Sequence, residues 1–314
     1  MNCDEIKIRD AFLTWNTYRL PTTDNNLFDY FLDLLETPIG LKTEYNLFRH
    51  LIFEEYNGDA DLFLNDVNRV KNEMETKYNN AFLTILNTFE KRNVPIHGII
   101  YTNYFNLPNG EYLEIDLSDA LTTSMFKYGY FNFKHWDVFI EQFSDKQIFK
   151  LKNTKILLSR LYKNLTSSAY LLHKKRMRGI LAETNNLKNI FSLKDETVLY
   201  VTGDSILINT NYIIDDINNV IKTKNIVGNE VHLSIFKMEQ LYFTNGYYVN
   251  SKKDLLSSKI TYFSGERLQT YYLPIIYKLQ MNLPLNDNDL YYGFNECILK
   301  LREPFSLLIK KSTT

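Results

Sequence analysis

The stretch from Val198 to Ile208, VLYVTGDSILI, constrains the fold of this 314-residue chain more than any other. Two runs of strand-forming residues flank Thr202, Gly203 and Asp204, and a glycine at that place favours a tight turn. The sequence therefore predicts a β-hairpin with Asp204 at its tip. An aspartate in a turn is also ordinary turn chemistry, so Asp204 alone does not indicate a functional site.

Helical periodicity dominates the region before Val94. Asp24 or Asn25 is a candidate cap for a short helix that Pro38 ends, and a second helix is predicted over 45–56. The clearest helix is Leu62–Glu90, whose apolar side chains recur every three or four residues. We therefore predict a helical N-terminal region over residues 1–93 with a packed aromatic core.

From Val94 the pattern changes to short strand-like runs. Strands are predicted over 99–101 and 112–116, and a polar loop then opens into a helix for which Ser118 and Asp119 are candidate N-caps. The remaining predicted helices cover 134–149, 151–172, 212–223, 268–281 (kinked by Pro274) and 290–302 (capped within 286–289). The remaining predicted strands cover 231–235 and 241–249, the latter broken at Asn245-Gly246. The fold class predicted is α+β, with regions 1–93, 94–263 and 264–314.

Composition is that of a globular protein, with 45% hydrophobic and 23% charged residues. The net charge of −1 argues against a general polyanion binder, so nucleic-acid affinity would need local patches. One such patch is the basic cluster of residues 173–178, which either is solvated or faces phosphate. The acidic pair at 215–216 is either an extra metal site or an exposed helix start.

The two cysteines, Cys3 and Cys297, share no metal-ligand spacing, which favours a reducing compartment. The N-terminus lacks an apolar signal region, and no apolar run reaches membrane-spanning length. We therefore expect a soluble cytoplasmic protein without a membrane partner. The 23 Tyr and 21 Phe, together with many Asn, Lys and Ile, suggest an AT-rich genome.

Four stretches match motifs in one order. Asp116–Met125, DLSDALTTSM, fits the frame of the pattern DxxSLYPSxM, and Lys155–Lys163, KILLSRLYK, keeps the Lys, Leu and Tyr of KxxxNSLYG. Tyr200–Ser205, YVTGDS, is similar to YxDTDS, and Phe236–Tyr248 is similar to the lysine-bearing strand pair that follows it. In these motifs the chain resembles the palm and fingers of family B DNA polymerases, especially the protein-primed enzymes of phages and linear plasmids, over residues 95–250.

The resemblance implies a palm-like antiparallel sheet, abbreviated fingers over 134–172 and a small helical thumb-like end. It implies two-metal nucleotidyl transfer, in which Asp116 and Asp204 meet on adjacent strands and hold two Mg²⁺ or Mn²⁺ ions. The resemblance further implies that Lys155 contacts the triphosphate, that Tyr162 packs under the nascent base pair, and that Ser159 and Leu121 line the nucleotide pocket. It implies that the Leu117 carbonyl completes the metal shell and that Lys237 contacts the primer strand. The DNA-binding residues it implies are Lys174, Lys175, Arg176 and Arg178. The implied partners are a primer–template and dNTP, together with protein partners in replication or virion assembly. The cell in which the protein acts can be an infected host cell.

The chain also departs from the family. Thr202 stands where the third motif has its first aspartate, and Leu121 replaces the tyrosine that screens the sugar 2′ position. Ser159-Arg160 replaces Asn-Ser in the fingers helix, and no carboxylate motif for a proofreading exonuclease is present. A non-catalytic protein of a phage or mobile element that inherited or mimics the palm, used for interaction or structure, is therefore the alternative. A reverse-transcriptase-like palm ranks third, because no template-grip motif lies between the two aspartates.

Overall fold

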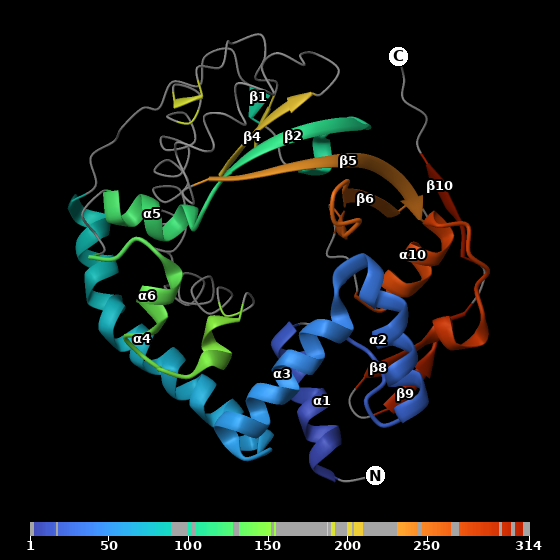
Figure 1. Cartoon of the computed structure of the whole chain (residues 1–314), viewed down its shortest axis with the longest axis horizontal. Helices are drawn as coiled ribbons and strands as arrows, with labels where there is room; N and C mark the ends of the chain where they lie inside the picture. Colours follow the sequence, from blue (N-terminus) through green and yellow to red (C-terminus); the bar gives the residue numbers. More distant parts are fainter. Residues whose placement is uncertain are drawn as a thin grey trace. The chain divides into compact units, whose positions relative to one another are not determined.

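The computed structural model describes residues 3–16, 18–88, 100–101, 104–127, 132–151, 154, 187, 190–191, 200–202, 204–209, 231–243, 247–264, 270–294, 297–302 and 305–309. It has an α+β fold with a helical N-terminal region, as the sequence predicts (Figure 1). The chain forms two compact units. The first comprises residues 1–64, 104–110 and 236–314, and the second comprises residues 65–103 and 111–235.

Helices α1 (Cys3–Asn16), α2 (Asn25–Ile39) and α3 (Leu41–Tyr56) belong to the first unit, as does the beginning of α4 (Ala60–Thr88). Five phenylalanines that are at most 1% exposed fill their core: Phe12, Phe28, Phe31, Phe48 and Phe63. The predicted cap is confirmed, because Asp24 Oδ1 accepts a hydrogen bond from the Leu27 N–H at 3.0 Å. The predicted end at Pro38 is wrong.

Helix α2 continues through Pro38 and ends where Gly40 adopts a left-handed conformation with φ of 72°. A proline in the last turn removes one hydrogen bond but does not prevent the preceding residues from being helical. The Gly40 N–H bonds to the Glu36 carbonyl at 2.8 Å, and this closes the helix.

The first unit also contains an antiparallel sheet made of the second half of β5 (Val231–Phe243), β6 (Tyr247–Asp254), β7 (Ile260–Ser264) and β10 (Leu307–Ile309). Strand β5 is continuous, so the predicted break between residues 235 and 241 is wrong. Helix α10 (Leu273–Gln280) packs on one face of this sheet through a cluster of Leu241, Val249, Ile275, Ile276 and Leu290. Short 3₁₀ turns lie at Tyr104–Asn106 and Thr270–Tyr272.

Two predictions near the C-terminus are wrong. The described residues within 290–302 are not α-helical; they include the antiparallel strands β8 (Tyr291–Phe294) and β9 (Cys297–Lys300). Pro274 does not kink a helix, because it occupies the first turn of α10, where its missing N–H would be unpaired in any case. The predicted Asn286 cap is present, but on the 3₁₀ turn Asp287–Leu290.

In the second unit the strand order is β1 (Ile100–Tyr101), β3 (Tyr200–Thr202), β4 (Ser205–Asn209), β2 (Gly110–Leu117) and β5. Strand β2 is antiparallel to β4, and β4 is antiparallel to β3, so β2 and β3 run in the same direction. Parallel strands need a crossover connection. Here residues 118–199 connect them and include α5 (Ala120–Lys127) and α6 (Trp136–Ile140).

One face of this sheet is an apolar core. Its buried members are Leu113, Ile115, Leu117, Ala120, Leu187, Phe191, Val201, Ile206, Ile208 and Val231. The predicted helix over 134–149 is wrong, because only α6 and a 3₁₀ turn at Gln147–Lys150 are helical there. The predicted helix over 212–223, and all but Leu151 and Thr154 of the one over 151–172, lie outside the described residues.

Candidate active site

Strands β3 and β4 form the predicted hairpin. Thr202 pairs with Ser205 across it, and Asp204 lies exposed in the turn. Strand β2 pairs with β4 so that Asp116 is opposite Ser205, and the Leu117 N–H donates to the Asp204 carbonyl at 3.0 Å. Asp116 and Asp204 therefore lie at the same end of two neighbouring strands, where β2 and β4 run side by side in Figure 1.

The two faces of β2 differ in chemistry because successive side chains point to opposite sides of a strand. Leu113, Ile115 and Leu117 face the apolar core. Glu114 and Asp116 therefore share the other face, and Ser205, directly opposite Asp116, lies on that face too. Asp116 is half-buried, whereas Glu114 is only 4% exposed.

Glu114 is the centre of a hydrogen-bonded network. Ser205 Oγ donates to Glu114 Oε1 at 3.0 Å, and Ser234 Oγ, from β5, donates to Glu114 Oε2 at 2.9 Å. Because the Ser205 proton is directed at Glu114, the Thr202 hydroxyl donates to Ser205 Oγ in its turn. A buried carboxylate needs such donors, since an unpaired buried charge costs several kcal/mol, on the order of the values found for broken buried pairs.

The sequence analysis did not single out Glu114. The signal was present in the spacing, because Glu114 and Asp116 are two residues apart in a strand whose intervening residues are apolar. Alternation places both carboxylates on one face. What the spacing does not give is the burial of Glu114, which depends on Ser205 and Ser234 coming from two other strands.

Of the two candidate N-caps, Asp119 directly precedes α5, and its carbonyl accepts a hydrogen bond from the Thr123 N–H at 2.9 Å. Ser118 Oγ is buried and has no hydrogen-bond partner among the described residues, so its side chain is not the N-cap of α5. Asp119 has a φ of 48°, and its Oδ2 accepts from the Trp136 N–H at 3.3 Å. The His135 Nδ1 lies 3.6 Å from the same oxygen, so Asp119 links the segment before α6 to the end of β2.

Other predicted site residues fall in different places. Leu117 is buried in the apolar core, and Leu121 belongs to α5. Lys237 is on the half of β5 that belongs to the first unit, where its Nζ lies 2.7 Å from Glu239 Oε1. The remaining predicted residues lie outside the described part of the chain: Lys155, Ser159, Tyr162, Lys174, Lys175, Arg176 and Arg178.

The pair Asp116 and Asp204 offers the carboxylate oxygens that Mg²⁺ and Mn²⁺ prefer. Across the described residues, no group of three or more His, Cys, Asp or Glu side chains is arranged to hold a metal ion. A metal at this place would therefore rely on these two aspartates, with backbone carbonyls, water or substrate oxygens as further ligands. Among the described helices, none combines the length and the apolar character needed to cross a membrane.

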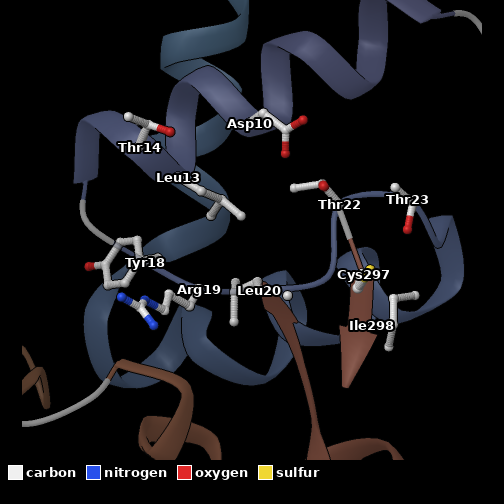
Figure 2. A pocket seen from close by; sticks show the side chains of 11 residues that line it. Asp10, Leu13, Thr14, Tyr18, Arg19, Leu20, Thr22, Thr23, Cys297 and Ile298 are labelled. Atoms are coloured by element: carbon white, nitrogen blue, oxygen red, sulfur yellow. The ribbon is translucent and has the colours of Figure 1, made fainter. Parts of the chain in front are cut away.

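A pocket of about 210 Å³ lies in the first unit and was not predicted (Figure 2). Its walls come from α1, from the segment 18–23 and from strands β8 and β9, including Asp10, Thr22 and Cys297. Gly293 permits the close approach of β8, because a Cβ there would lie 2.3 Å from the Leu20 carbonyl oxygen. Burial raises the pKa of Tyr18 at its edge. The mixture of carboxylate, hydroxyl and apolar groups selects no ligand class.

The comparisons with known proteins add no relative: no family model, no curated protein and no solved structure matches the chain.

Proposed function

We propose that the second unit is a polymerase-like nucleotidyltransferase in which Asp116 and Asp204 hold the catalytic metal ions. One observation supports this above the others: the two aspartates come from motifs 88 residues apart (204 − 116) and lie at the same end of neighbouring strands. The hydrogen bond from the Leu117 N–H to the Asp204 carbonyl joins the end of the strand that carries Asp116 to the turn that carries Asp204.

The chemistry of such a site is phosphoryl transfer between two divalent cations about 3.5–4 Å apart. One ion lowers the pKa of the attacking 3′-hydroxyl, and the other neutralises charge on the leaving pyrophosphate. Asp116 and Asp204 would bind both ions. Lys155 would contact the triphosphate, as the resemblance implies.

Primer extension tests this function. The full-length protein is incubated with a primer–template carrying a 5′ overhang, dNTPs, and Mg²⁺ or Mn²⁺. We expect extension by the wild type and its loss in Asp204→Asn and in Asp116→Asn. The matched control is Asp287→Asn, the same substitution at an exposed aspartate of the first unit, which should extend normally.

A second candidate is a non-catalytic interaction protein with the same sheet. The observation that favours it is Thr202, a buried hydroxyl at the place of the family's first aspartate in this motif. This candidate predicts no extension by the wild type with either metal. Extension that is unchanged in Asp204→Asn would contradict the nucleotidyltransferase proposal and point to a contaminating polymerase.

A further inference from the structure

Resting on the proposed function of Asp116 and Asp204, we infer that Glu114 is the positioning residue of this pair and acts through the Ser205 hydroxyl. The Glu114 side chain is 4% exposed, whereas Asp204 is exposed in the hairpin turn. Its role is to orient the groups beside the metal ions; it does not bind them itself.

The first step of the argument is the place of Glu114 in the sheet. Its two carboxylate oxygens accept hydrogen bonds from two different neighbouring strands, Ser205 on β4 and Ser234 on β5. A charged side chain is rarely this buried unless it is paired. Glu114 therefore ties β2 to the strands on both sides by side-chain bonds as well as by the backbone.

The second step is the place of Ser205. It is 0% exposed, it follows Asp204 directly, and it pairs with Asp116 across the sheet. Its hydroxyl donates to Glu114 and is hydrogen-bonded to Thr202, the residue at the other end of the hairpin turn. The chain Thr202–Ser205–Glu114 therefore fastens both ends of the turn that carries Asp204 to the strand that carries Asp116.

The third step is what this fastening does. Two carboxylates that share a cation repel each other before the cation binds, so a loose turn would let Asp204 move away from Asp116. Buried groups that hold metal ligands in place typically change metal affinity 10–100-fold when they are removed.

The experiment measures Mn²⁺ binding to the full-length protein by electron paramagnetic resonance. The site in question is the one whose Mn²⁺ binding is lost in Asp204→Asn. In Ser205→Ala we expect the Mn²⁺ Kd to rise at least about 10-fold. Ser234→Ala also removes one hydroxyl from Glu114, but from the side away from the hairpin, and should cause a smaller rise. The control is Ser251→Ala in the first unit, a serine equally buried at 0% exposure whose hydroxyl accepts from Gln280 at 2.8 Å; its Kd should not change.

A second variant covers the case in which Ser205→Ala fails to fold. Glu114→Gln keeps the size of the side chain but replaces one acceptor oxygen by an NH₂ donor, so it cannot accept from both serines. We expect its Mn²⁺ Kd to rise at least about 10-fold as well. The urea unfolding midpoints of all variants measure their general loss of stability, which we also expect in the Ser251→Ala control. They separate that loss from the change in Mn²⁺ affinity.

The outcomes distinguish the two proposals. If the wild type binds Mn²⁺ at a site that Asp204→Asn removes, but Ser205→Ala or Glu114→Gln binds as well as Ser251→Ala, the positioning role is overturned and the proposed function stands. If Ser234→Ala weakens binding as much as Ser205→Ala, the route through Ser205 is overturned. If the wild type has no such site, the proposed function fails, and the positioning role fails with it.

Discussion

Introducing a carboxylate at position 202 should destabilise the second unit, although the family that the motifs resemble has an aspartate there. Thr202 is 5% exposed, and its hydroxyl bonds to Ser205, which donates to Glu114. In Thr202→Asp the new carboxylate would be separated from that of Glu114 by one hydroxyl group. Two negative charges would then lie close together in a buried part of the sheet.

The magnitude follows from Coulomb's law. Ser205 Oγ lies 3.0 Å from Glu114 Oε1 and between the two side chains, so the two carboxylates would be roughly 5 Å apart, and the single Ser205 proton could be donated to only one of them. At an effective dielectric constant of about 20, two unit charges at this separation repel by about 3 kcal/mol. We therefore expect Thr202→Asp to lower the free energy of unfolding by about 3 kcal/mol through repulsion, and Glu114→Gln to remove most of that penalty by removing one of the charges.

A double-mutant cycle measures this coupling. Four proteins are unfolded in urea: wild type, Thr202→Asp, Glu114→Gln and the double variant, all in a Trp15→Phe background. The chain has two tryptophans, so the fluorescence then reports Trp136, which is 2% exposed in the second unit. The double variant should be more stable than the sum of the single effects by about 3 kcal/mol.

Additive effects, within about 0.5 kcal/mol, would refute the reasoning, because independent sites add to that accuracy. They would mean that the two side chains do not share a buried charge environment. A pH series gives a second check: the penalty of Thr202→Asp should shrink in acid, since protonating either carboxyl group removes the repulsion. A penalty that is constant down to about pH 4 would assign it to packing instead.

Three further predictions concern the first unit. Asp289→Asn should cost about 3–5 kcal/mol in urea unfolding, because it breaks a buried ion pair in which Lys278 Nζ lies 2.9 Å from Asp289 Oδ2. Gly293→Ala should lower the melting temperature, with about 1–3 kcal/mol of strain, because the added Cβ would meet the Leu20 carbonyl oxygen at 2.3 Å. For Glu239, burial alone would raise the pKa, but hydrogen bonds from Lys237 and Gln280 and the nearby lysine charges together lower the pKa from its ordinary value of 4.5. The stability it contributes is therefore present above pH 4.5 and lost as the pH falls below it, so the stability difference between wild type and Glu239→Gln should be largest near pH 6 and vanish in stronger acid.

The features that could be predicted from sequence are those set by neighbouring residues. The hairpin at Thr202–Ser205 follows from a glycine between two strand-forming runs, and the cap at Asp24 follows from one side chain reaching an N–H three residues on. The position of Asp116 at the end of a strand was equally local. When Asp116 and Asp204 both lie at strand ends in one sheet, they come close together if those two strands are neighbours.

The helix predicted over 134–149 failed because apolar spacing does not specify backbone conformation. Trp136, Phe139 and Phe143 recur at helical intervals and do pack together, with ring centroids 5.1 and 5.4 Å apart. Helix α6 nevertheless ends at Ile140, and the residues after it form turns that direct the same side chains inward. A compact irregular segment can therefore bury an aromatic cluster that the sequence attributes to one long helix.

The role of Glu114 was not predicted from the sequence for a different reason. The same reason bears on Thr202, which stands where the family that the motifs resemble has an aspartate. A charged residue in a strand is ordinarily assigned to solvent, and only its partners on β4 and β5 make its burial possible. The three carboxylates of this end of the sheet differ in exposure: Asp204 is exposed, Asp116 is half-buried and Glu114 is buried. The oxygens of Asp204 and Asp116 are accessible from the surface, whereas those of Glu114 accept hydrogen bonds from Ser205 and Ser234. The hydroxyl at Thr202 completes that buried layer, where a second charge would repel the first. A threonine at this position is therefore compatible with an active site.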